Sequence, residues 1–172
     1  MVDINVVPNV GVEYTGIFNF LEVYMKAKDF ITGLFYDWSE NEYSERLTSS
    51  GGKDLVIKWS CKRNIDLYVQ LKIDIKIQTF DLVDVDVVIN GKKIRMQKGT
   101  IRFNVDANVR TDREGKWEDN PVLHFFQHFY ERYIYKSMLD QSLRNLTGDG
   151  QQLQAYVRDM FEGYRQMHLA AQ

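Results

Sequence analysis

The sequence predicts an α+β domain in which a long antiparallel sheet packs against helices. From residue 65 to residue 77 every odd position is apolar and every even position carries a polar group. This period of two predicts a strand with one dry and one solvated face. Asn90-Gly91, a strong two-residue hairpin pattern, follows the next apolar stretch. Apolar residues recur at helical spacing towards the C-terminus. The 172 residues suit a single domain, residues 1–172.

The N-terminal segment predicts a short strand and a helix. Val2, Ile4 and Val6 alternate with polar residues, which favours a strand that ends before Pro8. Thr15 is a suitable N-cap for a helix over about residues 16–31, because its hydroxyl can accept a hydrogen bond from the first turn.

A β-meander of about five to seven strands is expected over about residues 34–110. Short strands are predicted at 36–38 and 43–47, with the loop 49–52 after them. A three-residue loop at 62–64 would place Trp59 opposite Leu67, joining two dry faces.

The parity of the apolar positions tests the hairpin at Asn90-Gly91. A two-residue turn pairs Val87 with Ile94, so the apolar set should change from odd to even numbers, and it does. After Gly99 the set returns to odd numbers, which requires one extra residue near Lys98-Gly99. A β-bulge at this position is favoured over a second tight turn, and it would place Asp106 opposite Lys76.

Two helices are expected after the meander. Pro121 is typical of a first helical turn and begins a predicted helix over about residues 121–146. The turn-forming residues 147–150 are expected to end it and to begin an amphipathic helix over about 150–168. Strands this long must twist and bend, so we expect the first of these helices to fill the hollow of a curved sheet. Its inward set would be Val122, Phe126, Phe129 and Tyr133.

This order of strand, helix, meander and C-terminal helix is similar to the START-like helix-grip architecture. That resemblance implies a curved sheet that grips a C-terminal helix, often around an apolar pocket. The chain departs from it by having one helix where such folds have a helical pair, and by an extra C-terminal helix. A cystatin-like or NTF2-like arrangement, with a helix wrapped by a meander, is the alternative.

Composition limits the class of partner and the cellular location that we expect for this chain. The net charge of −2 provides no basic field for phosphates and argues against nucleic acid as the main partner. The single Cys61 excludes an internal disulfide framework and is expected to be a buried, inert thiol. Since the start of the chain lacks signal-peptide character and no stretch of 18 apolar residues occurs, we expect a soluble, cytoplasmic protein without a membrane span.

Aromatic content supports a non-catalytic domain that binds a small hydrophobic or lipid-like ligand. The chain has 10 Tyr, 10 Phe and 3 Trp, and such rings commonly line apolar pockets. The predicted ligand-binding residues are Trp59, Phe103, Phe126, Phe129 and Tyr133.

Two other classes of function remain open. A protein-interaction domain could use the last helix or the edge formed by residues 36–46. A metal-dependent enzyme could use His124, His128 and Glu131, which fall on one helix face at i, i+4 and i+7. Carboxylates on the wet face of the sheet could bind a cation, but they are better explained as part of a solvated surface laced with lysines. No motif indicates a cofactor.

Overall fold

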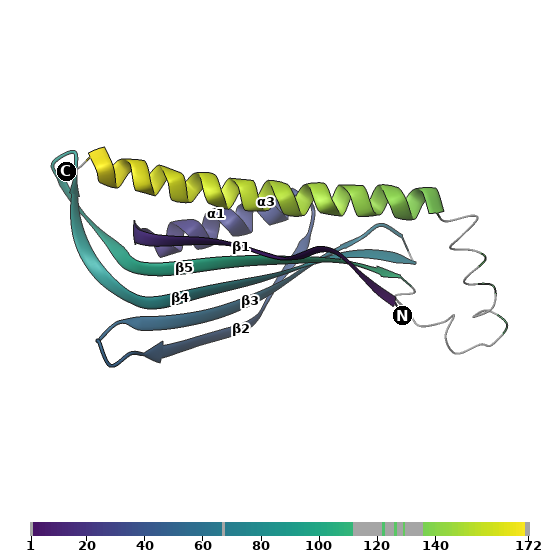
Figure 1. Cartoon of the computed structure of the whole chain (residues 1–172), viewed down its shortest axis with the longest axis horizontal. Helices are drawn as coiled ribbons and strands as arrows, with labels where there is room; N and C mark the ends of the chain where they lie inside the picture. The colour runs from purple at the N-terminus through teal and green to yellow at the C-terminus, as the bar shows by residue number, and fades with distance from the viewer. Residues whose placement is uncertain are drawn as a thin grey trace.

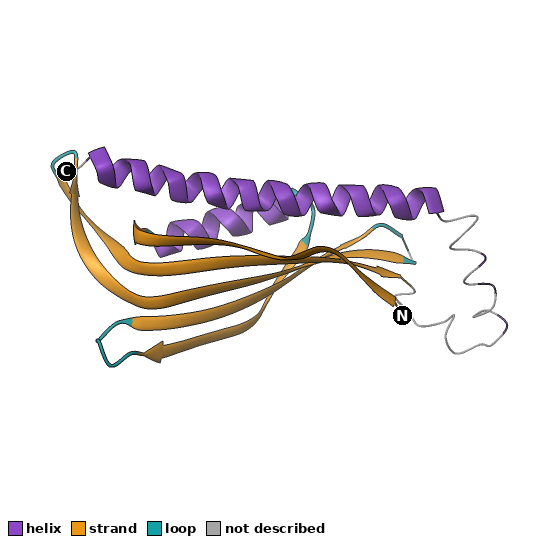
Figure 2. Cartoon of the chain, in the orientation of Figure 1, coloured by secondary structure: helices purple, strands orange, loops and turns teal. Residues whose placement is uncertain are grey.

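In the part of the chain that the structure describes, a five-stranded antiparallel sheet carries two helices, α1 and α3, on one of its faces (Figures 1 and 2). The structure, a computed structural model, describes residues 2–66, 68–111, 122, 126, 129 and 136–170. The strands run in the order β1-β5-β4-β3-β2, so β1 and β2 form the two edges. The α+β class and the antiparallel sheet predicted from the sequence are confirmed. In chain order the elements are β1 (Val2–Phe18), α1 (Phe20–Gly33), β2 (Asp37–Leu47), β3 (Lys53–Asn64), β4 (Val69–Ile89), β5 (Lys92–Thr111) and α3 (Lys136–Ala170).

The dry face of the sheet is the face that the apolar alternation predicted. The odd positions from 55 to 61 in β3, from 69 to 79 in β4 and from 101 to 111 in β5 are buried. Cys61 belongs to this face, and burial raises the pKa of its thiol to about 12, so it stays protonated near neutral pH. α3 crosses the same face above β1 and β5, and α1 lies beside it (Figure 1). The buried apolar residues of α3 are Leu146, Leu153, Val157, Phe161 and Tyr164.

The hairpin at Asn90-Gly91 has the predicted register. Val87 faces Ile94 and Asp86 faces Arg95. Asn90 has φ 51° and Gly91 has φ 76°, and a type I′ turn requires positive φ at both positions.

The predicted bulge exists, but its extra residue lies on the other strand. β4 contributes both Asp81 and Leu82 where β5 contributes Gly99 alone. Asp74 therefore faces Asp106, and the predicted pairing of Asp106 with Lys76 is wrong. Either strand could absorb the extra residue without disturbing the face of any side chain, so alternation could not decide between them.

Loop 48–52, which connects β2 and β3, forms hydrogen bonds with the bulge. Asp81 adopts φ 51°, and its backbone N–H donates to Asp54 Oδ1 at 2.8 Å. Its carboxylate accepts hydrogen bonds from Thr48 Oγ1 at 3.0 Å and from Ser50 Oγ. These hydrogen bonds lower the pKa of Asp81, the bond from Ser50 contributing most.

The turn between β3 and β4 lies further along the chain than predicted. Trp59 pairs with Ile75, not with Leu67, and β3 continues to Asn64. The two registers differ by an even number of residues, so both join dry face to dry face. On the other side of β3, a single strand β2 with one irregularity between Glu40 and Glu42 replaces the two predicted short strands.

At the N-terminus one long edge strand replaces the predicted short strand and the first turn of the helix. β1 continues past Pro8 with register shifts between Asn5 and Val10, which is tolerated because an edge strand leaves one row of N–H groups unpaired. Ile17 and Phe18 still pair with β5. α1 therefore begins later than predicted, with Asn19 as its N-cap in place of Thr15.

At the C-terminus one helix, α3, runs through residues 147–150, where a break was predicted. Leu146 and Leu153 are both fully buried, so packing on each side of the glycines outweighs their low helix propensity. Asp149 also links the helix to the sheet, since it accepts a hydrogen bond from Tyr36 at 2.8 Å and forms an ion pair with Arg63 at 3.0 Å.

The residues predicted to fill the hollow of the sheet do not do so in the structure. More than half of the surface of each of Val122, Phe126 and Phe129 is exposed, and α3 covers the sheet instead. Tyr133 lies outside the described residues.

Replacing Gly99 with Ala tests the bulge. A Cβ at this position would lie 3.0 Å from the Phe80 carbonyl oxygen and 3.1 Å from Leu82 Cα. We expect Gly99→Ala to lower the free energy of unfolding by about 1–3 kcal/mol in urea denaturation. Gly33→Ala is the control, because a Cβ there meets nothing within 4 Å. Equal stability of the two variants would contradict the close approach of β4 to Gly99.

Replacing Gly148 with Ala tests the continuity of α3. A Cβ there also meets nothing within 4 Å. In a continuous helix the change should raise the free energy of unfolding by about 0.5–1 kcal/mol, since glycine loses more backbone entropy than alanine. A destabilised variant in the same urea experiment would indicate the turn that the sequence predicted.

Candidate functional site

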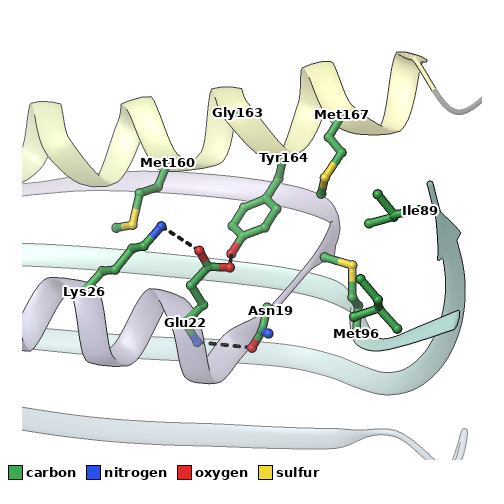
Figure 3. Close-up of a pocket in the computed structure, with 10 residues that line it drawn as sticks. Asn19, Glu22, Lys26, Ile89, Met96, Met160, Gly163, Tyr164 and Met167 are labelled. Atoms are coloured by element: carbon green, nitrogen blue, oxygen red, sulfur yellow. Dashed lines mark hydrogen bonds and ion pairs between the residues drawn. The ribbon is translucent and has the colours of Figure 1, made fainter. Parts of the chain in front are cut away.

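A cavity lies where the end of the sheet curls towards the C-terminal end of α3 (Figures 1 and 3). We call residues 82–98, which follow the bulge on β4 and precede Gly99 on β5, the distal hairpin. The space between the distal hairpin, the start of α1 and the end of α3 is the hairpin cavity, and its volume is about 540 Å³. Ligand sites of about 300–1,000 Å³ are typical. Its lining residues are Asn19, Glu22, Lys26, Ile89, Ile94, Met96, Met160, Gly163, Tyr164 and Met167.

The distal hairpin, α1 and α3 supply this lining. In the hairpin and in α3, the periodicity of the element places the apolar lining residues on one face. The dry face of the distal hairpin carries Ile89, Ile94 and Met96, the positions at which the apolar parity switches. Met160 and Met167 are seven residues apart in α3, so they share one face of the helix. The curl of the hairpin brings these two faces together across the end of the core (Figure 1).

The apolar wall of the cavity is rich in methionine. Met96 is buried, whereas Met160 and Met167 are half-buried against the core. Ile94 is 40% exposed. Methionine side chains are unbranched and polarizable, so they adapt to ligands of different shape. A small hollow of about 20 Å³ shares Met96 and Met167 with this cavity and is also lined by Ile17 and Val87.

The polar end of the cavity is organised by Glu22. Its Oε2 accepts a hydrogen bond from the Tyr164 hydroxyl at 2.5 Å, and its Oε1 lies 2.5 Å from the Lys26 ammonium nitrogen (Figure 3). Asn19 Oδ1 accepts from the Glu22 backbone N–H at 3.1 Å and so caps α1. The cap fixes where the first turn of the helix begins and thereby aims Glu22 at α3.

These contacts set the charge state of the polar end. The hydrogen bond from Lys26, and after it that from Tyr164, holds the pKa of the Glu22 carboxyl below its usual range. The bond to Glu22 raises the pKa of Lys26. Burial, followed by the bond to Glu22, raises the pKa of Tyr164. At neutral pH the polar end therefore holds a carboxylate, an ammonium and a neutral phenol.

Four of the five predicted ligand-binding residues are among the described residues, and Tyr133 lies outside them. Phe103 and Trp59 are 0% and 1% exposed and form part of the core. Phe126 and Phe129 are at the surface, 52% and 55% exposed. None of the four is among the described residues that line the cavity. Aromatic content did not indicate the hairpin cavity, because the apolar side chains that line it are mainly those of methionine and isoleucine.

The solvated face of the sheet carries a second, more polar hollow of about 370 Å³. Asp74 and Asp106 face each other across β4 and β5 in this region. The Lys72 ammonium lies 2.6 Å from Asp74 and offsets its charge. Within the described part of the chain, no group of three or more His, Cys, Asp or Glu could hold a metal ion. His124, His128 and Glu131 lie outside the described residues, so a metal site there stays a prediction.

No protein-family model matches the chain, and no curated protein or solved structure matches it significantly. Among the described residues, neither helix combines the length and the apolarity needed to cross a membrane.

Replacing Tyr164 with Phe tests the polar end. Loss of the phenolic donor should raise the pKa of Glu22 towards its ordinary value, although Lys26 still holds it lower. A carboxyl with a lowered pKa stabilises the folded state above its ordinary pKa and loses this effect as the pH falls. Tyr164→Phe should therefore weaken the acid dependence of stability, and NMR titration of the Glu22 carboxyl measures the shift directly.

Tyr24→Phe is the matched control, because the Tyr24 hydroxyl donates to Glu40 at 2.7 Å and not to Glu22. A Glu22 pKa that is the same in the wild type and in Tyr164→Phe would refute the assigned hydrogen bond.

Proposed function

We propose that this chain is a non-catalytic binding protein that holds a small apolar or lipid-like ligand in the hairpin cavity. The observation that carries the proposal is a cavity of about 540 Å³ whose apolar wall is partly exposed to solvent. Apolar surface removed from water contributes roughly 25 cal/mol per Å². An apolar ligand that covers Ile89, Ile94 and the methionines would therefore be stabilised by their desolvation.

The arrangement of the polar groups supports binding as the role of this site. Glu22, Lys26 and Tyr164 bond to one another at one end, and the remaining wall is mainly apolar. Ligand sites typically combine an apolar lining with a few placed polar groups that orient the ligand. Lys26 and Glu22 have exposed side-chain fractions of 49% and 40%, so a ligand can reach them from solvent.

A protein-interaction role is the second candidate, and Phe35 favours it. This residue follows α1 with φ 63°, a conformation that bulky side chains rarely adopt, and its side chain is 84% exposed. It precedes β2, which is an edge of the sheet and can accept another strand. Native mass spectrometry of the purified chain would separate the two roles. A mass excess lost on denaturation indicates a bound small molecule, and a doubled mass or a bound protein indicates the β2 edge.

Replacing Gly163 with Phe tests the ligand site. Gly163 lines the cavity from α3, and a Cβ there meets nothing within 4 Å. The Phe ring should therefore occupy the cavity while the helix remains folded. We expect at least about tenfold weaker binding of Nile red, a neutral apolar dye, in a fluorescence titration, equivalent to about 1.4 kcal/mol.

Gly148→Phe is the matched control, since Gly148 lies in the same helix, also has open space around it and does not line the cavity. Dye binding that is equally strong in both variants, or absent from the wild type, would contradict the proposal.

A further inference from the structure

The polar end of the cavity offers hydrogen-bond donors to a ligand. Both oxygens of Glu22 already accept a hydrogen bond or ion pair, from Tyr164 and from Lys26, each at 2.5 Å. Asn19 Oδ1 is likewise engaged by the Glu22 backbone N–H. The Lys26 ammonium has three N–H donors, and the Asn19 amide has two on its nitrogen. A ligand with an acceptor can therefore bind N–H groups of Lys26 that Glu22 does not use, next to a carboxylate to which two donors are already bound.

The polar and apolar parts of the lining lie at different places in the cavity. Figure 3 shows the Lys26 ammonium beside Met160, whereas Ile89, Met96 and Met167 gather at the hairpin end. A ligand that satisfies both parts has an acceptor-bearing head at Lys26 and an apolar chain that extends towards Met96. A small hollow of about 20 Å³ shares Met96 and Met167 with the cavity at this end.

Charge favours an anionic head over a cationic one. The bond to Glu22 keeps Lys26 protonated and leaves it positively charged while its side chain is 49% exposed. A cationic head would have to displace Lys26 from Glu22 and would then lie beside a like charge. A carboxylate can bind N–H groups of the Lys26 ammonium that Glu22 does not use, and the hydrogen bond from Tyr164 helps to offset the charge of the neighbouring Glu22. Charge-assisted hydrogen bonds are about twice as strong as neutral ones.

From this arrangement we propose that the ligand of the hairpin cavity is a single-chain amphiphile with an anionic head, of the fatty-acid class, whose carboxylate binds Lys26 and whose chain packs on Met160, Met96 and Met167. The inference rests on the proposed function, because it names the class of ligand for the same cavity. Lys26 and Asn19 then determine head-group specificity, and the methionines tolerate variation in the chain.

Three probes with the same chain and different heads test the inference. The affinities of dodecanoate, dodecanol and dodecylammonium are measured by their displacement of bound Nile red at about pH 8, where the carboxylate is ionised and the ammonium is protonated. We expect dodecanoate to bind at least about tenfold more tightly than dodecanol, and dodecylammonium to bind the most weakly of the three.

Lys26→Met should remove the preference for the carboxylate. The variant keeps most of the aliphatic stem and loses the ammonium, so the affinity for dodecanoate should fall about tenfold, to the level of dodecanol. Any effect of the variant on the shape of the cavity is common to dodecanoate and dodecanol, so the ratio of the two affinities isolates the contribution of the ammonium. Lys26→Arg should retain the preference, because it retains the positive charge.

Lys58→Met is a closely matched control. Lys58 pairs with Glu42 at 2.6 Å and its side chain is 49% exposed, as that of Lys26 is, but it lies on the other face of the sheet. It should leave the affinities for all three probes unchanged.

The outcomes separate the head-group inference from the proposed function. Equal affinity of the wild type for dodecanoate and dodecanol, tighter binding of dodecylammonium, or an unchanged preference in Lys26→Met would overturn the anionic head while the apolar site stands. Failure of Nile red and dodecanol to bind the wild type would overturn the proposed function and this inference with it.

Discussion

The contact between the dry face of the sheet and α3 is the constraint on which the rest of the structure depends. β4 and β5, of 21 and 20 residues, present a continuous row of buried side chains such as Ile75, Ile77 and Phe103. A surface of that length cannot be left in water, and only a long helix can cover it. α3 has 35 residues and provides that cover, which explains why it runs through residues 147–150 despite their turn-forming character.

The bulge turns this layered arrangement into one with a cavity. Asp81 and Leu82 opposite Gly99 shift the register by one residue, and bulges increase local twist and bend. Beyond this point the distal hairpin curls towards the end of α3 instead of continuing along a flat sheet (Figure 1). The hydrogen bonds of Asp81 with Thr48 of loop 48–52 and with Asp54 of β3 hold the bend at its base. The candidate site therefore depends on a backbone irregularity about ten residues from the hairpin tip.

Alternation in the sequence predicted the faces of the strands reliably and their registers only where turn chemistry added information. Asn90-Gly91 determines a two-residue turn, so Val87 was correctly placed opposite Ile94. Between β3 and β4 no such pair exists, and Trp59 was placed opposite Leu67 when its partner is Ile75. The cavity could not be found from the sequence, because Met96 and Met160 line the same cavity only as a result of the curl of the hairpin.

By itself the sequence determined the α+β class, the dry and wet faces of the strands and the register of the β4–β5 hairpin between its turn and the bulge, since these follow from local periodicity and turn geometry. Only the tertiary structure decided which strand carries the bulge, where α1 begins, that α3 is continuous and that Glu22 lies beside Tyr164. Each of these depends on a contact between segments far apart in the chain. Glu22 and Tyr164 are 142 residues apart, and their hydrogen bond forms only because both helices pack on the same sheet.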